Sequence, residues 1–366
     1  MLKLVRDKFL RLNNSPSLMR LALKERILFI KRLSTLIRAG VPLLSALVMI
    51  KKQAKSKVMI RIMDQVIRDT ENGQYLATSL GKFRKIFGEL TINIIEIGEV
   101  SGTLGENLDY LAEELKKKQA LRRKVVSASV YPIFIIIATF GITVLLTVFV
   151  FPKILPIFRS VNFELPWTTR VLIFLSSLMI NHGLLIFLGL IVLVVGVWLL
   201  LKLDRFKFAF HRMLIALPLV GRLTQGYNMA NICRTTGLLL RTSVNIVRST
   251  KITANTTTNL VYKKELNEIA EKLTKGESIS THMEAKPKFF PSIASQMISV
   301  GESTGNLSET FIYLSNMYEE EVDDLTKNLS TVIEPLLLIF MGVLVGFVAI
   351  SIITPIYGIT QHLNPK

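Results

Sequence analysis

The sequence is poor in the residues that build cofactor and metal sites. It has one cysteine, Cys233, among 366 residues, which excludes an intramolecular disulfide and a thiolate metal cluster. Its four histidines are scattered, and none has the spacing of a metal-binding motif such as H-E-x-x-H. The phosphate-binding pattern G-x-x-x-x-G-K-[ST] is also missing. We therefore expect no catalytic centre, no cofactor and no ATP hydrolysis by this chain.

Charge is absent from three long stretches. No Asp, Glu, Lys or Arg occurs in residues 125–152, 171–201 or 335–365, although 20% of the chain is charged. The mean hydropathy is +0.44, and a membrane-spanning helix needs about 20 apolar residues. We predict one span in each stretch. Buried helices of a large soluble core are the alternative, but such helices seldom extend this far without a charge.

Lysine and arginine are unevenly distributed around these stretches. Residues 1–127 hold 25 of them and residues 202–331 hold 16, whereas residues 152–170 hold 3. Basic residues next to spans favour the cytoplasmic side, so both large polar regions are expected inside and the C-terminus outside. The net charge of +18 suits contact with anionic lipid headgroups or an acidic partner. Nucleic-acid binding is not expected, because its motifs are missing.

The chain contains a tandem duplication. A shift of 203 residues without a gap places "EIGEVSGTLGENLDYL" at 96–111 on "SVGESTGNLSETFIYL" at 299–314, with seven identities. The same shift places Pro132, at the start of the first predicted span, on Pro335, which follows Glu334 at the start of the third. Two units in the same orientation need a return crossing between them, and the second span supplies it.

The cytoplasmic regions show helical spacing of apolar residues, with Gly40 and Pro42 marking a break between two helices. The expected fold is an all-α integral membrane protein with two tandem helical-bundle cytoplasmic domains and three transmembrane helices. The predicted parts are, in chain order, a basic N-terminal segment (1–26), a first cytoplasmic domain (27–127), a first span (128–152), an external loop with the approach to the second span (153–182), a second span (183–201), a second cytoplasmic domain (202–331), a third span (332–357) and an external tail (358–366).

The repeated phrase contains a G-E-x-x-G motif. Its two copies are Gly98, Glu99 and Gly102, and Gly301, Glu302 and Gly305. The glycines suit a turn between two closely packed helices, which is a purely structural interpretation. The carboxylates of Glu99 and Glu302 could alternatively accept backbone N–H bonds, pair with an arginine of a partner, or bind a cation. We predict that the two copies form a structural or interaction motif. Cation binding by Glu99 and Glu302 is one of the alternatives, and we assign no metal ligand.

Five segments of the chain form a recognisable set, "RLSTLIRAGVPLLSAL", "IGEVSGTLGENLDYLAEEL", "LPWTT", "VGESTGNLSETFIYLSNMYEEEV" and "IEPLLLIFMGVLVGFVAISIITPIY". Together they resemble the type II secretion system F family. The resemblance covers about residues 27 to 358. In the second copy, Ser243 and Asn245 stand where glycine and proline would be expected from the first copy.

The resemblance implies a polytopic inner-membrane platform protein of type II secretion, type IV pili or competence pseudopili. The resemblance also implies that the platform is a homo-oligomer. Its implied partners are a cytoplasmic assembly ATPase, pilin or pseudopilin subunits, other inner-membrane assembly proteins and membrane lipid. Two alternatives stay open. One is a membrane scaffold or receptor of another assembly, and the other is a small-solute transporter, which would be expected to carry ionisable residues within its spans.

Overall fold

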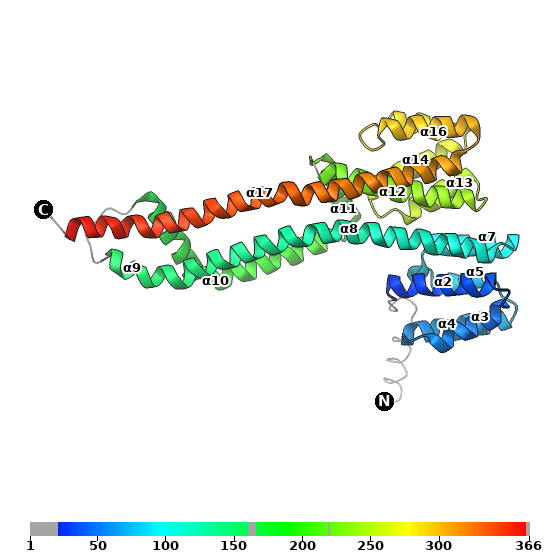
Figure 1. Ribbon diagram of the computed structural model, residues 1–366, viewed down its shortest axis with the longest axis horizontal. Helices are drawn as coiled ribbons and strands as arrows, with labels where there is room; N and C mark the ends of the chain where they lie inside the picture. The colour runs from blue at the N-terminus through cyan, green and yellow to red at the C-terminus, as the bar shows by residue number, and fades with distance from the viewer. Residues whose placement is uncertain (1–20, 160–165, 219, 364–366) are drawn as a thin grey trace. The chain divides into compact units, whose positions relative to one another are not determined.

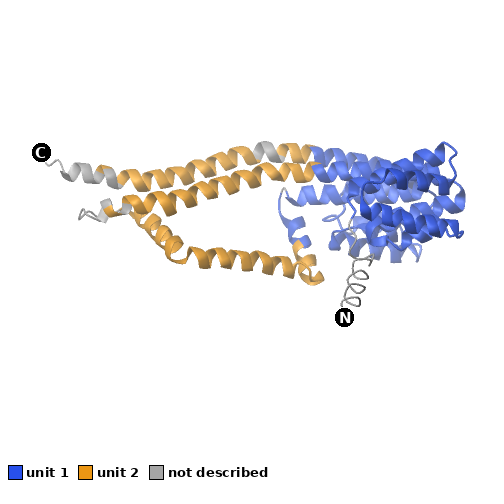
Figure 2. Ribbon diagram, turned by 90° about the horizontal axis from the view of Figure 1, so that it is seen from below, with its two compact units in different colours: residues 1–123, 211–323 blue, residues 124–210, 324–366 orange. Residues whose placement is uncertain are grey.

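A computed structural model of the protein describes residues 21–159, 166–218 and 220–363 (Figure 1). Parts of three predicted segments, namely residues 1–20 of the N-terminal segment, 160–165 of the external loop and 364–366 of the tail, lie outside the described residues. Within the described ranges every regular element is helical. The chain divides into two compact units, residues 1–123 with 211–323 and residues 124–210 with 324–366 (Figure 2).

The first unit contains both copies of the repeat. The first copy consists of α2 (Leu23–Arg38), α3 (Leu43–Gln53), α4 (Lys57–Glu71), α5 (Leu76–Gly81), α6 (Arg84–Phe87), α7 (Glu89–Ser101) and the start of α8 (Leu104–Leu145). The second copy consists of α12 (Val220–Arg241), α13 (Ile246–Thr256), α14 (Leu260–Leu273), α15 (Ile279–Glu284), α16 (Ser292–Thr304) and the start of α17 (Leu307–Leu363). The bounds of α13, α15 and α16 fall 203 residues after those of α3, α5 and α7.

Apolar residues at helical spacing build the core of each copy. In the first copy, Ile30 and Leu33 of α2 are fully buried with Leu47 of α3. In the second copy, the ring of Tyr262 lies edge-on to Phe290, with their centroids 5.9 Å apart. The two copies are therefore small helical bundles, as the sequence predicts.

The break between the first two helices has the same backbone geometry in both copies but is built from different residues. Gly40 has φ 81°, and Pro42 is the N-cap of α3. At the equivalent positions, Ser243 has φ 64° and Asn245 is the N-cap of α13, where its Oδ1 accepts the N–H of Arg248 at 2.8 Å. The second copy thus keeps the turn without the glycine and the proline. Its Ser243, which has a Cβ, adopts the left-handed backbone conformation that is unfavourable for such a residue.

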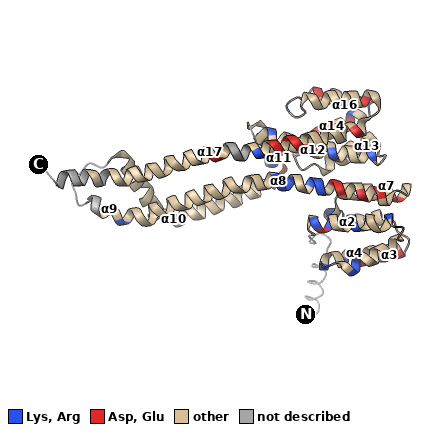
Figure 3. Cartoon of the chain, viewed as in Figure 1, with Lys and Arg blue, Asp and Glu red and all other residues tan. Residues whose placement is uncertain are grey.

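The second unit contains the apolar parts of the long helices. Among the residues that the structure describes, three helical stretches are long and apolar enough to cross a membrane, Leu104–Ile154, Trp167–Leu200 and Leu307–Thr354. Charged side chains are dense on the helices of the first unit and sparse on those of the second (Figure 3). Helix α10 (Trp167–Leu200) includes residues 167–182, which the sequence analysis assigned to the external loop and the approach to the second span. Asn181 and His182 lower the local hydropathy, but neither residue breaks a helix.

Hydrogen bonds from hydroxyl groups connect the apolar helices of the second unit. Helix α8 is followed by a π-helical turn, Leu146–Val150, and then by α9 (Phe151–Arg159). Pro152 has no N–H to donate to the preceding turn, and a local π-helix is one way to absorb that loss. Ser176 Oγ donates to the carbonyl of Thr147 in this turn at 2.8 Å, and Thr169 Oγ1 donates to the carbonyl of Ser351 at 2.8 Å. Lipid tails cannot donate hydrogen bonds to backbone carbonyl groups, whereas these hydroxyl groups can.

Candidate functional site in the repeated motif

The glutamate of each G-E-x-x-G motif caps a neighbouring short helix. The backbone N–H groups of Leu76 and Ala77 donate to Oε1 and Oε2 of Glu99 at 2.6 and 2.7 Å. These are the first two residues of α5, whose own N-cap residue, Tyr75, gives no side-chain cap. A carboxylate at this place satisfies N–H groups that the helix cannot use and suits the positive end of its dipole. Burial raises the pKa of Glu99, and the two N–H groups counteract part of that increase.

The second copy repeats this arrangement. Oε1 of Glu302 accepts the N–H of Ile279 at 2.7 Å, and its Oε2 accepts both the N–H and the hydroxyl of Ser280, at 3.2 and 2.5 Å. Ile279 and Ser280 begin α15, which is the counterpart of α5. Of the three roles considered for these carboxylates, the geometry shows the acceptance of backbone N–H groups. The partner arginine and the cation stay predictions.

The first glycine of each motif lies where two helices touch. A Cβ on Gly98 would lie 2.8 Å from the Cα of Leu104, at the start of α8, and a Cβ on Gly301 would lie 2.6 Å from Oγ1 of Thr310 in α17. Both distances are shorter than real Cβ contacts, so an added Cβ would force the backbone of Leu104 or the side chain of Thr310 to shift. The long helix that follows each motif is held directly against the helix that carries the motif.

The last glycine of each motif ends that helix. Gly102 and Gly305 are the C-caps of α7 and α16, with φ values of 72° and 73°. This left-handed conformation is open to glycine without steric cost. Each motif therefore builds one junction, in which a short helix is capped, a second helix ends and a long helix begins. The sequence analysis located these residues through the duplication but did not identify the capped helices.

The residues predicted at the start of the spans do not join this junction. Pro132 lies inside α8 and Pro335, with Glu334, lies inside α17, so each long helix continues from its motif past the predicted start of its span. Neither proline is the first residue of a helix. Their role at the start of a span stays a prediction.

From the sequence alone we expected no G-x-S-x-G pattern of a serine nucleophile elbow, but that prediction was wrong, because residues 301–305 of the second motif match it. An elbow needs a sharp turn between a strand and a helix. Ser303 instead lies in the last turn of α16, and its Oγ donates to the carbonyl of Val300 at 2.9 Å. Cys233 is fully buried, and burial raises the pKa of its thiol to about 12, which keeps it unreactive.

Arg234 is a buried residue whose role sequence reasoning missed. Its side chain is 3% exposed and forms ion pairs with Glu319 of α17 and with Glu114 of α8. The pair with Glu114 joins Nε and Oε2 at 2.9 Å, but the geometry is not that of a hydrogen bond. Burial raises the pKa of Glu114, while Arg234 lowers it in part. One guanidinium thus contacts the polar segments of both long helices. The signal was available, because the 203-residue shift places Arg234 on Lys31, which pairs with Asp109 of α8 at 2.6 Å.

A second group missed by sequence reasoning surrounds Glu265 in α14. Its carboxylate lies 3.1 Å from Nε2 of His282 and 3.3 Å from Nζ of Lys286. The ligand atoms of Glu265, Glu268 and His282 are close enough to one another to hold a metal ion together. The ammonium of Lys286 already supplies positive charge at this carboxylate. We therefore assign the group as a buried polar network that joins α14 to α15.

Comparison of the sequence with known proteins identifies the family of this chain. The sequence profile of the family described as "Type II secretion system (T2SS), protein F" matches residues 29–152 and, a second time, residues 232–355. The chain belongs to the type II secretion system protein F family. Both ends of the second match lie 203 residues after those of the first, so the family's unit is the duplicated unit. With its three long apolar helices, this family member is a multi-pass inner-membrane protein.

Relatives from two kinds of machine are similar over nearly the whole chain. The type IV pilus assembly protein PilC of Thermus thermophilus is 32% identical over 342 residues, which cover 93% of this chain and 84% of PilC. PilC of Pseudomonas aeruginosa is 30% identical over 333 residues, 90% of this chain and 88% of that protein. The type II secretion system protein F of Pseudomonas aeruginosa is 30% identical over 344 residues, 93% of this chain and 84% of that protein.

Proposed function

We propose that this chain is the inner-membrane platform of a filament-assembling machine, a type IV pilus, a type II secretion system or a competence pseudopilus. The observation that carries the proposal is the pair of motif junctions, each placed at the start of a helix that continues into a predicted span. Membership of the protein F family and the names of its relatives support the class of machine. The platform acts as a structural protein without catalysis of its own.

The platform couples a separate cytoplasmic ATPase to pilin or pseudopilin subunits in the membrane. The distribution of lysine and arginine supports an orientation with both bundles in the cytoplasm and the C-terminus outside. A motor that displaces the bundles would move α8 and α17, because each motif holds the start of its long helix rigidly against the bundle. Motion then reaches the spans along a continuous helix, and a homo-oligomer of such chains presents several moving helices to the subunits.

This coupling is tested by removing both capping carboxylates. We expect the variant Glu99→Ala with Glu302→Ala to insert into the membrane at the normal level and to assemble few filaments, because α5 and α15 lose the contacts that position them. The measurement is the number of surface filaments per cell by electron microscopy, with membrane fractionation for insertion.

A matched control is Glu106→Ala with Glu309→Ala. These carboxylates also lie 203 residues apart, in the first turns of α8 and α17, and both residues are exposed. The control should assemble filaments normally. Normal filament numbers in the Glu99 and Glu302 double variant would rule out the proposed coupling.

A further inference from the structure

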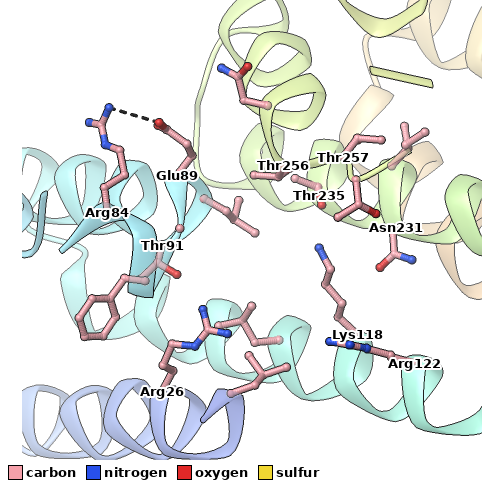
Figure 4. Close-up of a pocket in the computed structure, with 18 of the residues that line it drawn as sticks. Arg26, Arg84, Glu89, Thr91, Lys118, Arg122, Asn231, Thr235, Thr256 and Thr257 are labelled. Carbon is pink, nitrogen blue, oxygen red and sulfur yellow. Dashed lines mark ion pairs between the residues drawn. The ribbon is translucent and has the colours of Figure 1, made fainter. Parts of the chain in front are cut away.

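A basic cavity of about 650 Å³ lies between the two copies of the repeat in the first unit. The first copy contributes residues of α2, α6, α7 and α8, and the second contributes residues of α12, of the end of α13 and of the loop that follows it. Arg26 of α2 and Lys118 of α8 extend into the cavity, and Asn231, Thr235 and Thr256 face it from the second copy (Figure 4). Cavities of this size take small molecules or single chemical groups.

Positive charge in this cavity exceeds negative charge. Arg84 is neutralised by Glu89, with 3.2 Å between Nη1 and Oε1. Within the described part of the chain, no carboxylate pairs with Arg26, Lys118 or Arg122. The Nε of Arg26 is buried without a hydrogen-bond partner. Burial lowers the pKa of Lys118, and the nearby Arg234 and Arg26 lower it further, as expected where cations converge without a counter-ion.

Other donors face the same space. Residues 88–91, the start of α7, line the cavity, and the N-cap of this helix, Gly88, has no side chain to satisfy the first N–H groups. Free N–H groups at a helix N-terminus favour an anion. The hydroxyl of Thr235 also lines the cavity and can donate a hydrogen bond, whereas the hydroxyls of Thr256 and Thr257 already donate to the carbonyl of Thr253.

The fold does not require these cations. The 203-residue shift places Arg26, Lys118 and Arg122 on Met229, Glu321 and Leu325. The second copy therefore builds the equivalent helices with an apolar residue or an acid at all three positions. A cluster that one copy carries and the other lacks calls for an explanation other than stability.

We propose that this cavity binds a phosphate group. Two guanidinium groups, an ammonium and a free helix N-terminus match the charge and the multiple acceptor oxygens of a phosphate better than those of a single carboxylate. The phosphate could belong to a soluble compound or to a phospholipid headgroup. Arg122 stands three residues before Val125, where the uncharged stretch that contains the first predicted span begins.

The test uses the full chain in detergent and in nanodiscs. The site variant is Lys118→Gln with Arg122→Gln, and its matched control is Lys116→Gln with Arg123→Gln, which removes the same charge from the same helix outside the cavity lining. Calorimetric titration with inorganic pyrophosphate probes the soluble source. Native mass spectrometry after extraction from nanodiscs of phosphatidylglycerol and phosphatidylcholine probes the headgroup. The variant Lys118→Arg with Arg122→Lys keeps both charges and should keep binding.

Two results support the proposal and separate the sources. Pyrophosphate binding that weakens about tenfold or more in the site variant, and stays unchanged in the control, assigns a soluble phosphate. Retention of phosphatidylglycerol that only the site variant loses, without pyrophosphate binding, assigns a headgroup. Equal loss in the site variant and the control, or no binding of either probe, overturns the proposal. Crosslinking from Lys118 to an acidic segment of another protein, with neither probe bound, overturns it in favour of a protein contact.

Discussion

At the scale of single residues, the duplication shows which positions the fold constrains. Gly102 and Gly305 are glycine in both copies because both end a helix in the left-handed conformation. Gly40 and Ser243 differ, although both have positive φ. A residue with a Cβ in this conformation costs about 1–2 kcal/mol, so the second copy carries a strain that the first avoids.

Replacing Ser243 by glycine should relieve that strain. We expect Ser243→Gly to stabilise the chain by about 0.5–1 kcal/mol, because part of the relief is offset by the greater freedom of glycine in the unfolded chain. Thermal unfolding of the purified protein in detergent, followed by circular dichroism, measures the effect. The reciprocal change, Gly40→Ser, should destabilise. A stability loss in Ser243→Gly would contradict this explanation of the turn.

The residue-scale predictions from sequence were strongest where the two copies agree. Gly98, Glu99 and Gly102 were identified because identical residues recur at one shift. The N–H groups that Glu99 binds were not identified, because the helix that it caps begins 23 positions earlier in the chain, at Leu76, and no local pattern marks the pair. Arg234 was missed because its partners are 85 and 120 positions away and no local pattern links it to them.

At the scale of elements, the junction of α7 with α8, and of α16 with α17, decides how each long helix is held. The absence of a side chain at Gly98 lets α7 approach the backbone of Leu104. Close packing of this kind transmits displacement, because well-packed interiors yield little. A larger residue at the contact must push the two helices apart.

Alanine at this contact should weaken the bundle. We expect Gly98→Ala to destabilise the chain by about 1–3 kcal/mol, because the added methyl group overpacks the junction. Gly301→Ala should act in the same direction, with a smaller effect if the side chain of Thr310 rotates. Gly81→Ala is the control, since a Cβ there meets no atom within 4 Å. Thermal unfolding of the three variants gives the comparison, and equal stability of all three would refute the close contact.

Element boundaries were harder to predict from the sequence than element types. The uncharged stretches identified all three apolar helices, because charge is costly in a span. Their ends were less well defined, because hydropathy records polarity while a helix ends only where backbone hydrogen bonding ends. Helix α10 therefore extends back to Trp167, past the polar pair of Asn181 and His182.

At the scale of the whole molecule, Arg234 links the two copies. Its guanidinium contacts Glu114 of α8 and Glu319 of α17, so the two helices that continue into predicted spans share one buried cation. Another link between the copies joins Arg248 of α13 to Glu96 of α7 at 2.8 Å, but this pair is exposed and contributes little. The buried group is the stronger constraint.

Removing this cation should destabilise the first unit. We expect Arg234→Met to cost about 3–5 kcal/mol, because Glu114 and Glu319 would stay close to each other without a counter-charge. Adding Glu114→Gln and Glu319→Gln should recover part of the loss. Denaturant or thermal unfolding of the single and triple variants measures both effects. A triple variant less stable than Arg234→Met alone would show that repulsion between the carboxylates is not the cause.

The central claim is that this protein is the platform on which a filament is assembled. The most direct measurement is to delete the gene, count surface filaments by electron microscopy, and score protein secretion and DNA uptake in the same strain and in a complemented strain. We predict that at least one of these activities is lost, with pilin subunits left in the membrane, and that complementation restores it. Normal filaments, secretion and DNA uptake in the deletion strain, under conditions where the machinery is expressed, would contradict the claim.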